Sequence, residues 1–377
     1  MSVAFLDLGA QDAAIGGEVR AAIEAVLASR QFILGPHVER FEAAMASYCG
    51  VRHAIGVASG TDALFLALQA LGVGPGRGVL TTPFTFFSTA STVLRLGGRL
   101  VFADIDPRTF NLDPVAAAAA LDDARGTVVG LLPVHLFGRL APMADLGALA
   151  ARRGVWIVED AAQAVGAREG GVAAGALGRA GILSFYPTKN LGALGDGGMV
   201  LTGDGDLAAA LRRERHQGQS DPYVHASLGV CSRLDALQAA ALGAKLSHLD
   251  DWNRRRRRVA GWYGELLADA GLAGDSGAPL ATPEPAGDAH VFHQYVVRAR
   301  DRDRLRAHLA AAGIGTMIYY PMPLHLQPAL AHLDLAPGSF PVAERAAREV
   351  LALPIYPEIA RTQVETVVEA IAVFYGR

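Results

Sequence analysis

The sequence predicts an α/β fold, with a large domain built on a mostly parallel sheet of seven strands flanked by helices and a smaller α+β domain at the C-terminus. Between about residues 50 and 205, short β-branched or aliphatic runs alternate with longer helical patterns, which is typical of βα units around a parallel sheet. The 377 residues, of which 51% are hydrophobic and 19% charged, are enough for one large domain and a smaller one. The 43 glycines cluster between apolar runs without a fixed period, which excludes repeat and low-complexity architectures.

Seven strands are predicted in this first part of the chain, at residues 53–58, 78–81, 100–104, 127–134, 155–159, 181–185 and 199–202. Amphipathic helices separate them, for example over residues 62–71 and 143–152, where apolar side chains recur at three- and four-residue spacing. After residue 202 the pattern predicts two long helices, over residues 206–216 and 234–267, which lead out of the sheet domain.

The rest of the chain is expected to form the smaller domain. Residues 271–288 are rich in Gly, Pro and Ala and have little periodicity, as in a loop or a domain boundary. A strand over residues 292–298 and a helix over residues 301–312, ended by Gly313, are predicted after it. We therefore expect a large domain over residues 1–250 and a small domain over residues 251–377, and the N-terminal segment is free to pack with the small domain.

Composition excludes several classes of partner. The 34 Lys and Arg residues do not outnumber the 37 Asp and Glu residues, so nucleic acid is not expected as a partner. The two cysteines, Cys49 and Cys231, form neither a disulfide framework nor a metal-binding knuckle, and we expect no metal site. Residues 307–333 carry no Asp, Glu, Lys or Arg but contain three prolines and three histidines, so they are read as buried and not as a membrane span. The first residues lack the pattern of a signal peptide, and a cytoplasmic location is expected.

The most informative segment contains a lysine placed just after a predicted buried strand. Residues 184–192 read SFYPTKNLG and residues 195–198 read GDGG. Burial at such a position lowers the pKa of Lys189, and a lysine of this kind can form a Schiff base. Taken alone, Lys189 is more readily explained as an ordinary surface lysine in a glycine-rich loop, and the segments described next argue against that explanation.

A pair of carboxylates, Glu159 and Asp160, ends the strand predicted over residues 155–159. Ligands of open α/β sheets bind at the carboxyl ends of strands, and pyridoxal phosphate needs an acid there to keep its ring nitrogen protonated. We assign this role to Asp160. The alternative is that either carboxylate caps the helix that follows.

Two further segments have the character of a cofactor site. In the turn Ser59-Gly60-Thr61-Asp62, free backbone N–H groups and the positive end of a helix suit an anion, although simple helix capping explains the same pattern. Residues 82–89 read TPFTFFST and end the next strand with hydroxyl and aromatic side chains. One of these rings could stack on a flat cofactor, while core packing is the ordinary role of a Phe.

These four segments together resemble the DegT/DnrJ/StrS-type nucleotide-sugar aminotransferases, which belong to the fold-type I pyridoxal-phosphate enzymes. The resemblance extends from residues 5–8 (FLDL) and 32–36 (FILGP) to residues 321–325 (PMPLH). It implies that Gly60, Thr61 and Ser184 bind the cofactor phosphate. It also implies that Phe86 stacks on the ring, that Gln163 lies beside the phenolic oxygen and that Asp160 pairs with the ring nitrogen. Lys189 would form the Schiff base and move the proton between cofactor and substrate carbons.

The resemblance also implies a function. We expect amino transfer from glutamate or glutamine, through pyridoxamine phosphate, to a keto sugar on a nucleoside diphosphate, with a preference for dTDP-3-keto-6-deoxyhexose. A keto-cyclitol and a 4-keto nucleotide sugar remain alternative acceptors. A non-catalytic regulator that binds pyridoxal phosphate is the alternative from another class, although no DNA-binding extension supports it and the arginine run at residues 254–258 is the one basic stretch. The resemblance implies a homodimer whose active sites are shared.

One position departs from the family pattern, and several others are ambiguous. Cys231 stands where relatives have an Asn that reaches the phosphate bound by the neighbouring subunit, and a thiol is a much weaker donor than an amide. Tyr320 and His325 are the candidates for contact with the sugar nucleotide. The five arginines at residues 254–258 would point all around a helix and are expected to be mostly solvated. His135, at the end of a strand, is either a satisfied core histidine or part of the site.

Overall fold

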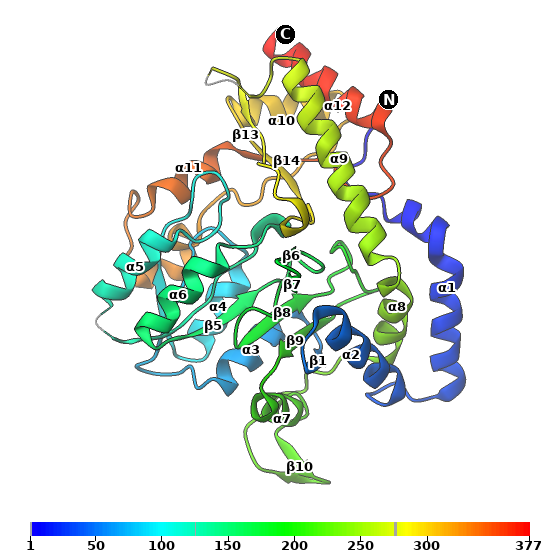
Figure 1. Ribbon diagram of the computed structural model, residues 1–377, viewed down its shortest axis with the longest axis vertical. Coiled ribbons are helices and arrows are strands. Elements are labelled where there is room, and N and C mark those ends of the chain that lie inside the picture. Colours follow the sequence, from blue (N-terminus) through cyan, green and yellow to red (C-terminus); the bar gives the residue numbers. More distant parts are fainter. Residues whose placement is uncertain (1, 125, 275–276) are drawn as a thin grey trace.

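The computed structural model describes residues 2–124, 126–274 and 277–377 of the chain. It shows a central sheet with helices on both sides and a second, smaller lobe that holds both ends of the chain (Figure 1). Within the described ranges, no helix has the combination of length and apolar character needed to cross a membrane. In the same ranges, no cluster of three or more His, Cys, Asp or Glu side chains has the geometry of a metal site.

The central sheet has seven strands, and the predicted mixed, mostly parallel α/β architecture is confirmed. In spatial order its strands are β1 (His53–Val57), β9 (Gly198–Thr202), β8 (Ala180–Ser184), β5 (Trp156–Asp160), β4 (Val128–Leu131), β2 (Gly78–Thr81) and β3 (Arg99–Phe102). Only β9 runs antiparallel to its neighbours, β1 and β8. The strand predicted over residues 127–134 ends earlier, at Leu131, because Pro133 has no N–H for the ladder.

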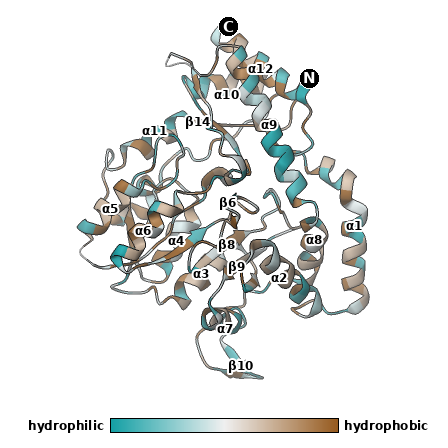
Figure 2. Cartoon of the chain, viewed as in Figure 1, coloured by the Kyte–Doolittle hydropathy of each residue, from teal (hydrophilic) through white to brown (hydrophobic). Residues whose placement is uncertain are grey.

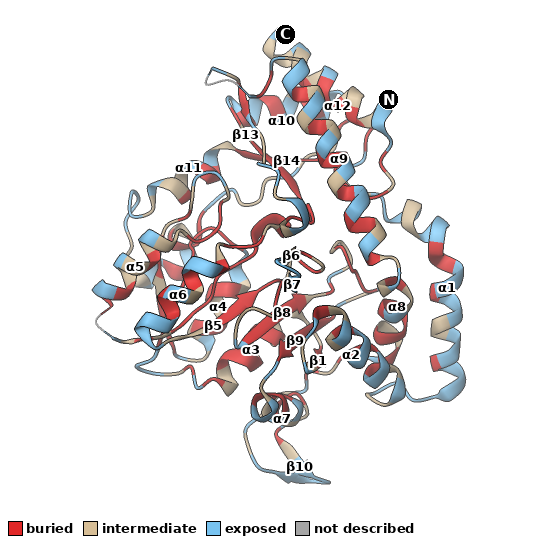
Figure 3. Ribbon diagram, in the orientation of Figure 1, coloured by how far each residue is buried: buried red, intermediate tan, exposed pale blue. Residues whose placement is uncertain are grey.

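Both faces of this sheet are covered, and most of its residues are buried, as the largely red strands of Figure 3 show. Successive side chains of a strand point to opposite faces. On β8, Ile182 belongs to one hydrophobic cluster and Leu183 to another on the opposite face. The first face is covered by α3 (Gly60–Ala70), α4 (Phe87–Arg95) and α7 (Gly205–Glu214). The second face is covered by α2 (Pro36–Cys49), α5 (Pro114–Asp123), α6 (Met143–Arg153) and α8 (Ala236–Leu246), with α1 (Leu8–Ser29) packed outside α8.

The helix predicted over residues 234–267 is two helices, and that expectation was wrong. After α8, Ser247 and His248 turn the chain, and α9 (Leu249–Asp269) leads to the second lobe. The break lets α8 pack on the sheet while the later part of α9 packs in a separate core. Because apolar spacing continues through the turn, the pattern does not reveal it. Figure 2 shows the hydrophilic stretch of α9 in teal.

The second lobe contains a three-stranded antiparallel sheet of β12 (Leu280–Ala281), β13 (Tyr295–Ala299) and β14 (Val350–Leu353). The helices α10 (Arg302–Ala311), α11 (Pro341–Glu349) and α12 (Arg361–Tyr375) complete it. The strand predicted from residue 292 begins three residues later, because Phe292 has a φ of 46°, which a strand does not accept. Residues 275 and 276 of the predicted loop lie outside the described residues.

The N-terminal segment packs with this lobe. The Val3 N–H donates to the Gly313 carbonyl at 3.0 Å, and the Gly315 N–H donates to the Val3 carbonyl at 2.9 Å. Val3 is fully buried in the same cluster as the strands and helices of the lobe. The domain division that we propose, between residues 250 and 251, falls in the first turn of α9. Two short hairpins, β6–β7 (Arg168–Glu169, Val172–Ala173) and β10–β11 (Gln219–Asp221, Val224–His225), lie outside both sheets.

Candidate active site

The candidate site forms where β5 and β8 end side by side. These strands are parallel neighbours, and Asp160 at the end of β5 lies opposite Ile182 of β8. The chain leaves β8 at Ser184 and turns, with the Lys189 N–H donating to the Tyr186 carbonyl at 2.8 Å. The two segments that carry the predicted lysine and carboxylate are therefore brought to one edge of the sheet, where ligands of such sheets bind.

Lys189 has the properties of a reactive amine. Burial lowers its pKa to about 8, against an opposing effect of the nearby Asp160 carboxylate. Because only the neutral amine attacks a carbonyl carbon, the lowered pKa leaves more Lys189 in the reactive form near neutral pH.

Asp160 is held by two donors at the bottom of the site. The Thr89 hydroxyl donates to Oδ2 at 2.9 Å, and the Ala162 N–H donates to Oδ1 at 3.3 Å. Burial raises the pKa of Asp160, whereas these hydrogen bonds and the charge of Lys189 lower it. The carboxylate keeps acceptor capacity on both oxygens for a further partner.

A chain of two hydroxyl groups ends on Asp160, and sequence reasoning missed it. Thr85 and Thr89 are both buried, and their Oγ1 atoms lie 3.1 Å apart. Since Thr89 uses its only proton toward Asp160, Thr85 donates to Thr89. The four-residue spacing of the two threonines is visible in the sequence, but no local pattern shows that their hydroxyls lead to Asp160.

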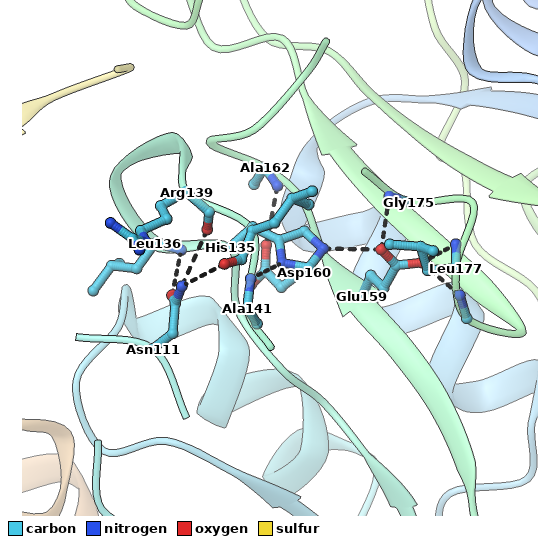
Figure 4. A network of polar contacts seen from close by, with 12 residues as sticks. Asn111, His135, Leu136, Arg139, Ala141, Glu159, Asp160, Ala162, Gly175 and Leu177 are labelled. Atoms are coloured by element: carbon cyan, nitrogen blue, oxygen red, sulfur yellow. Dashed lines mark hydrogen bonds and ion pairs between the residues drawn. The ribbon is translucent and has the colours of Figure 1, made fainter. Parts of the chain in front are cut away.

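The carboxylate of Glu159, the neighbour of Asp160, accepts hydrogen bonds from within the fold on both oxygens (Figure 4). Its carboxylate accepts three backbone N–H groups of residues 175–178 at 2.5–2.8 Å. His135 Nε2 lies 2.9 Å from Glu159 Oε2, and His135 Nδ1 accepts from the Ala141 N–H at 3.0 Å, so Nε2 carries the proton. His135 is therefore a satisfied core histidine. Of the two adjacent carboxylates, Asp160 is the one with room for a ligand.

The start of α3 presents free donors close to the end of β8. The Ser59 side chain accepts from the Asp62 N–H at 3.1 Å, but within the described ranges the N–H groups of Gly60 and Thr61 have no hydrogen-bond partner. A Cβ at Gly60 would lie 2.8 Å from the Cβ of Ser184, so a side chain at residue 60 would fill this space. Unpaired N–H groups at a helix start, next to hydroxyl side chains, fit a phosphate.

Gln163 and Tyr320 meet at the same site. The Gln163 Oε1 accepts from the Phe137 N–H at 2.6 Å, and its Nε2 donates to the Tyr320 hydroxyl at 3.3 Å. The rings of Phe86 and Tyr320 are tilted toward each other with centroids 6.4 Å apart. Phe86 is 57% exposed, so one face of its ring is available to a flat ligand.

Two other sequence candidates lie in different surroundings. His325 is buried against α11, where its Nε2 lies 3.0 Å from Glu344 Oε1 and its ring packs on Phe340. No hydrogen bond joins it to the other candidate residues. Cys231 is exposed, and its Sγ accepts from Arg233 Nη2 at 2.9 Å.

The chain is similar over almost its whole length to known proteins. Residues 13–372 match the DegT/DnrJ/EryC1/StrS aminotransferase family. A relative from Geobacillus stearothermophilus, named a pleiotropic regulatory protein, is 48% identical over 100% of this chain and 99% of its own length. A dTDP-3-amino-3,4,6-trideoxy-alpha-D-glucose transaminase from Streptomyces venezuelae is 45% identical over 98% and 95%.

Two further matches extend this comparison. A UDP-N-acetyl-3-dehydro-alpha-D-glucosamine 3-aminotransferase from Acidithiobacillus ferrooxidans is 42% identical over 98% of this chain and 97% of its own. The crystal structure of S. venezuelae DesV in complex with a ketimine intermediate matches with a TM-score of 0.94 and 44% identity, covering 100% of this chain and 99% of that one. The chain therefore belongs to the DegT/DnrJ/EryC1/StrS aminotransferase family of pyridoxal-phosphate-dependent, fold-type I proteins, which includes sugar aminotransferases.

Proposed function

We propose that this protein transfers an amino group from glutamate to a keto sugar carried on a nucleoside diphosphate, with a dTDP-linked 3-keto-6-deoxyhexose as the substrate. One observation carries the proposal. A lysine whose pKa is lowered to about 8 shares a buried site with Asp160, and Asp160 retains free acceptor positions. Such a pair suits a Schiff-base lysine and the partner of a protonated ring nitrogen.

The residues of the site fit pyridoxal phosphate. Gly60, Thr61 and Ser184 offer the N–H and hydroxyl donors that a phosphate needs. Asp160 would hold the proton on the ring nitrogen, and Phe86 would pack on the ring. When bound, the cofactor supplies an electron sink that lets an amino group move between carbon atoms.

Lys189 and Gln163 have separate tasks in this arrangement. Lys189 would bind the cofactor through Nζ and, once displaced by the amino donor, would take up and return a proton at that same atom. Gln163 is oriented by the Phe137 N–H and by Tyr320, so that its amide lies ready to contact the phenolic oxygen. These tasks need a site with fixed side chains, and the hydrogen bonds of Asp160 and Gln163 supply that rigidity.

The proposed acceptor is inferred from the names of relatives that have similar sequence identity to this chain. One relative is named for a dTDP-linked 3-amino sugar and another for a UDP-linked 3-dehydro sugar. Both names place the amino group at C3, which supports a 3-keto sugar over the 4-keto sugar and keto-cyclitol alternatives. A non-catalytic regulator is a second candidate, because the relative from G. stearothermophilus is named a regulatory protein.

We further propose that two copies of the chain share their active sites. Several large apolar side chains near the site are exposed, among them Phe86 at 57%, Tyr186 at 54% and Leu194 at 55%. The β10–β11 hairpin extends away from α7 (Figure 1), and Tyr223 at its tip is 94% exposed. A cover by a second copy of the chain would remove these apolar side chains from water. Light scattering after gel filtration should give twice the mass of one chain, and a monomer would contradict this proposal.

The function is tested by absorbance and by product analysis. Protein loaded with pyridoxal phosphate should show a visible-edge band that glutamate shifts to shorter wavelength, and Lys189→Ala should lose the band of the lysine adduct. Asp160→Asn should keep the fold but lose most turnover, because a charged partner of this kind contributes several kcal/mol to a transition state, on the order of 3 kcal/mol. Near-normal turnover of this variant would overturn the role of Asp160.

A panel of acceptors then separates the candidates. The panel contains dTDP- and UDP-linked 3-keto sugars, a 4-keto nucleotide sugar and a keto-cyclitol, each offered with glutamate. Mass spectrometry should detect an amino sugar with the dTDP-linked 3-keto substrate. A band that responds to cofactor, together with no amino product from any acceptor, would favour the regulator instead.

A further inference from the structure

A small cavity of about 250 Å³ opens beside the lysine loop. Its polar lining comes from three parts of the chain: Thr188, which precedes the reactive lysine; Arg256 of α9; and His293, Gln294 and Tyr319 of the second lobe. Apolar side chains of the N-terminal segment and of the second lobe complete the wall. His293 Nδ1 lies 3.2 Å from the side-chain oxygen of the residue that follows the lysine. The cavity therefore adjoins the reacting centre.

The cavity wall carries a buried positive charge that makes no direct ion pair within the described residues. Arg256 is 4% exposed, and no Asp or Glu of the described chain lies within ion-pair distance of it. Its Nη1 donates to three backbone carbonyls, while its Nε has no partner within the described ranges. Burial and the charges of Lys189 and Arg256 lower the pKa of His293 well below its usual range, so its ring is neutral. Burial lowers the pKa of Arg256 to about 10, and the charge of Glu358 opposes this shift without forming an ion pair. A ligand that brings an anion into direct contact would therefore stabilise the buried cation.

Other polar groups around the cavity also lack strong hydrogen-bond partners within the described residues. Within the residues that the structure describes, the hydroxyls of Thr188 and Tyr319 make no hydrogen bond to protein. The Gln294 side chain has only a 3.4 Å contact with the His293 ring. No carboxylate lines the cavity. A set of donors around a fixed guanidinium favours an acceptor-only anion, and a carboxylate is such a group.

The size of the cavity limits the ligand. Pockets for drug-sized ligands have volumes of roughly 300–1,000 Å³, and this cavity has about 250 Å³. It is too small for a nucleotide sugar but large enough for the end of an amino acid. A nucleoside diphosphate would also bring two phosphates, whereas one guanidinium faces the cavity.

We propose that this cavity binds a carboxylate of the amino donor, with Arg256 as its charge partner and Thr188, Tyr319 and Gln294 as additional donors. The inference rests on the proposed function, since it names the residues that would recognise a dicarboxylic donor such as glutamate. It also gives a role to one arginine of the run at residues 254–258. Arg256 is the buried member of that run, and its neighbours Arg254 and Arg255 are exposed.

The test uses glutarate, a dicarboxylate that lacks an amino group and cannot react. Isothermal titration with the cofactor-loaded protein should show that Arg256→Gln weakens glutarate binding at least tenfold and that Tyr319→Phe weakens it several-fold. Arg254→Gln is the matched control, because this arginine lies in the same run, its side chain is 68% exposed and it does not line the cavity. Its affinity should equal that of the unchanged protein. Tyr319→Phe keeps the proposal testable if Arg256→Gln does not fold, since the phenol oxygen supports no other residue.

Single-turnover kinetics provide a second readout. The variants should slow the reaction of the loaded protein with glutamate far more than the reaction of the pyridoxamine form with the keto sugar. Equal losses in both half-reactions, or glutarate binding unchanged in Tyr319→Phe and in a folded Arg256→Gln protein, would overturn the carboxylate site. If glutamate causes no spectral change in the unchanged protein, the proposed function fails, while glutarate titration still decides whether the cavity binds a carboxylate.

Discussion

Thr89→Val is expected to shift the acid limb of the glutamate half-reaction to higher pH. Valine keeps the shape of threonine but lacks the hydroxyl that donates to Asp160 Oδ2 at 2.9 Å. Asp160 is 5% exposed, so water does not replace this donor easily. A hydrogen bond to a charged group contributes roughly 1.5–3 kcal/mol, which corresponds to a factor of about ten to one hundred in the equilibrium between charged and protonated Asp160.

The sign follows from the direction of the pKa shift. Burial raises the pKa of Asp160 and the Thr89 hydroxyl lowers it, so removing the hydroxyl raises the pKa further and protonates Asp160 at a higher pH. The charged carboxylate is the form that pairs with a protonated ring nitrogen, so the rate falls earlier on the acid side.

The assay is stopped-flow absorbance with glutamate over a range of pH. Thr89→Ser keeps the hydroxyl and should retain the original profile. Thr85→Val removes the donor to Thr89 and should shift the limb by less than Thr89→Val does, because Thr85 acts through Thr89. An acid limb that is identical in Thr89→Val and in the unchanged protein would refute the role of the hydroxyl chain.

Three further predictions concern the cofactor site and its support. Burial lowers the pKa of Lys189 to about 8. The rate at which cofactor-free protein forms the Schiff base should therefore rise with pH and level off near pH 8. A rate that continues to rise to about pH 10, as for an ordinary lysine, would contradict the lowered pKa. Gly60→Ala should weaken cofactor binding, because the added Cβ would lie 2.8 Å from a neighbouring side-chain carbon. Gly17→Ala, whose Cβ would have nothing within 4 Å, should bind the cofactor normally. Equilibrium dialysis measures the cofactor affinity of both variants. Glu159→Gln turns an NH₂ group toward backbone N–H donors and should destabilise the fold by roughly 1–3 kcal/mol, seen as a lower Tm. An unchanged Tm would show that these hydrogen bonds contribute little.

The segments that carry the site could be read from the sequence because their positions follow from strand ends. Lys189 and Asp160 each come directly after an apolar run, and in a parallel sheet such ends meet at one edge. The sequence does not show which of the two carboxylates, Glu159 or Asp160, faces the site. Adjacent residues of a strand point to opposite faces, and only the structure shows that residues 175–178 occupy the Glu159 side.

Contacts between distant segments account for what the sequence could not show. The bond from Thr89 to Asp160 joins α4 to β5, and no local pattern encodes that approach. The turn at Ser247 and His248 interrupts no periodicity, since the core that each helix faces is decided by tertiary packing. Likewise, the burial of Arg256 among exposed arginines depends on the carbonyl groups of the second lobe.

The strand order of the main sheet bears on when this protein acquires its cofactor during synthesis. The first strand to leave the ribosome, β1, pairs only with β9, the last strand of the sheet to be made. The α3 turn and the lysine loop therefore cannot meet until residue 202 has emerged, and pairing across such a sequence separation is slow. Until then, Gly60 and Ser184, which we propose hold the cofactor phosphate, lie apart. Capture of a cofactor by these residues would accordingly be a late event that follows assembly of the sheet.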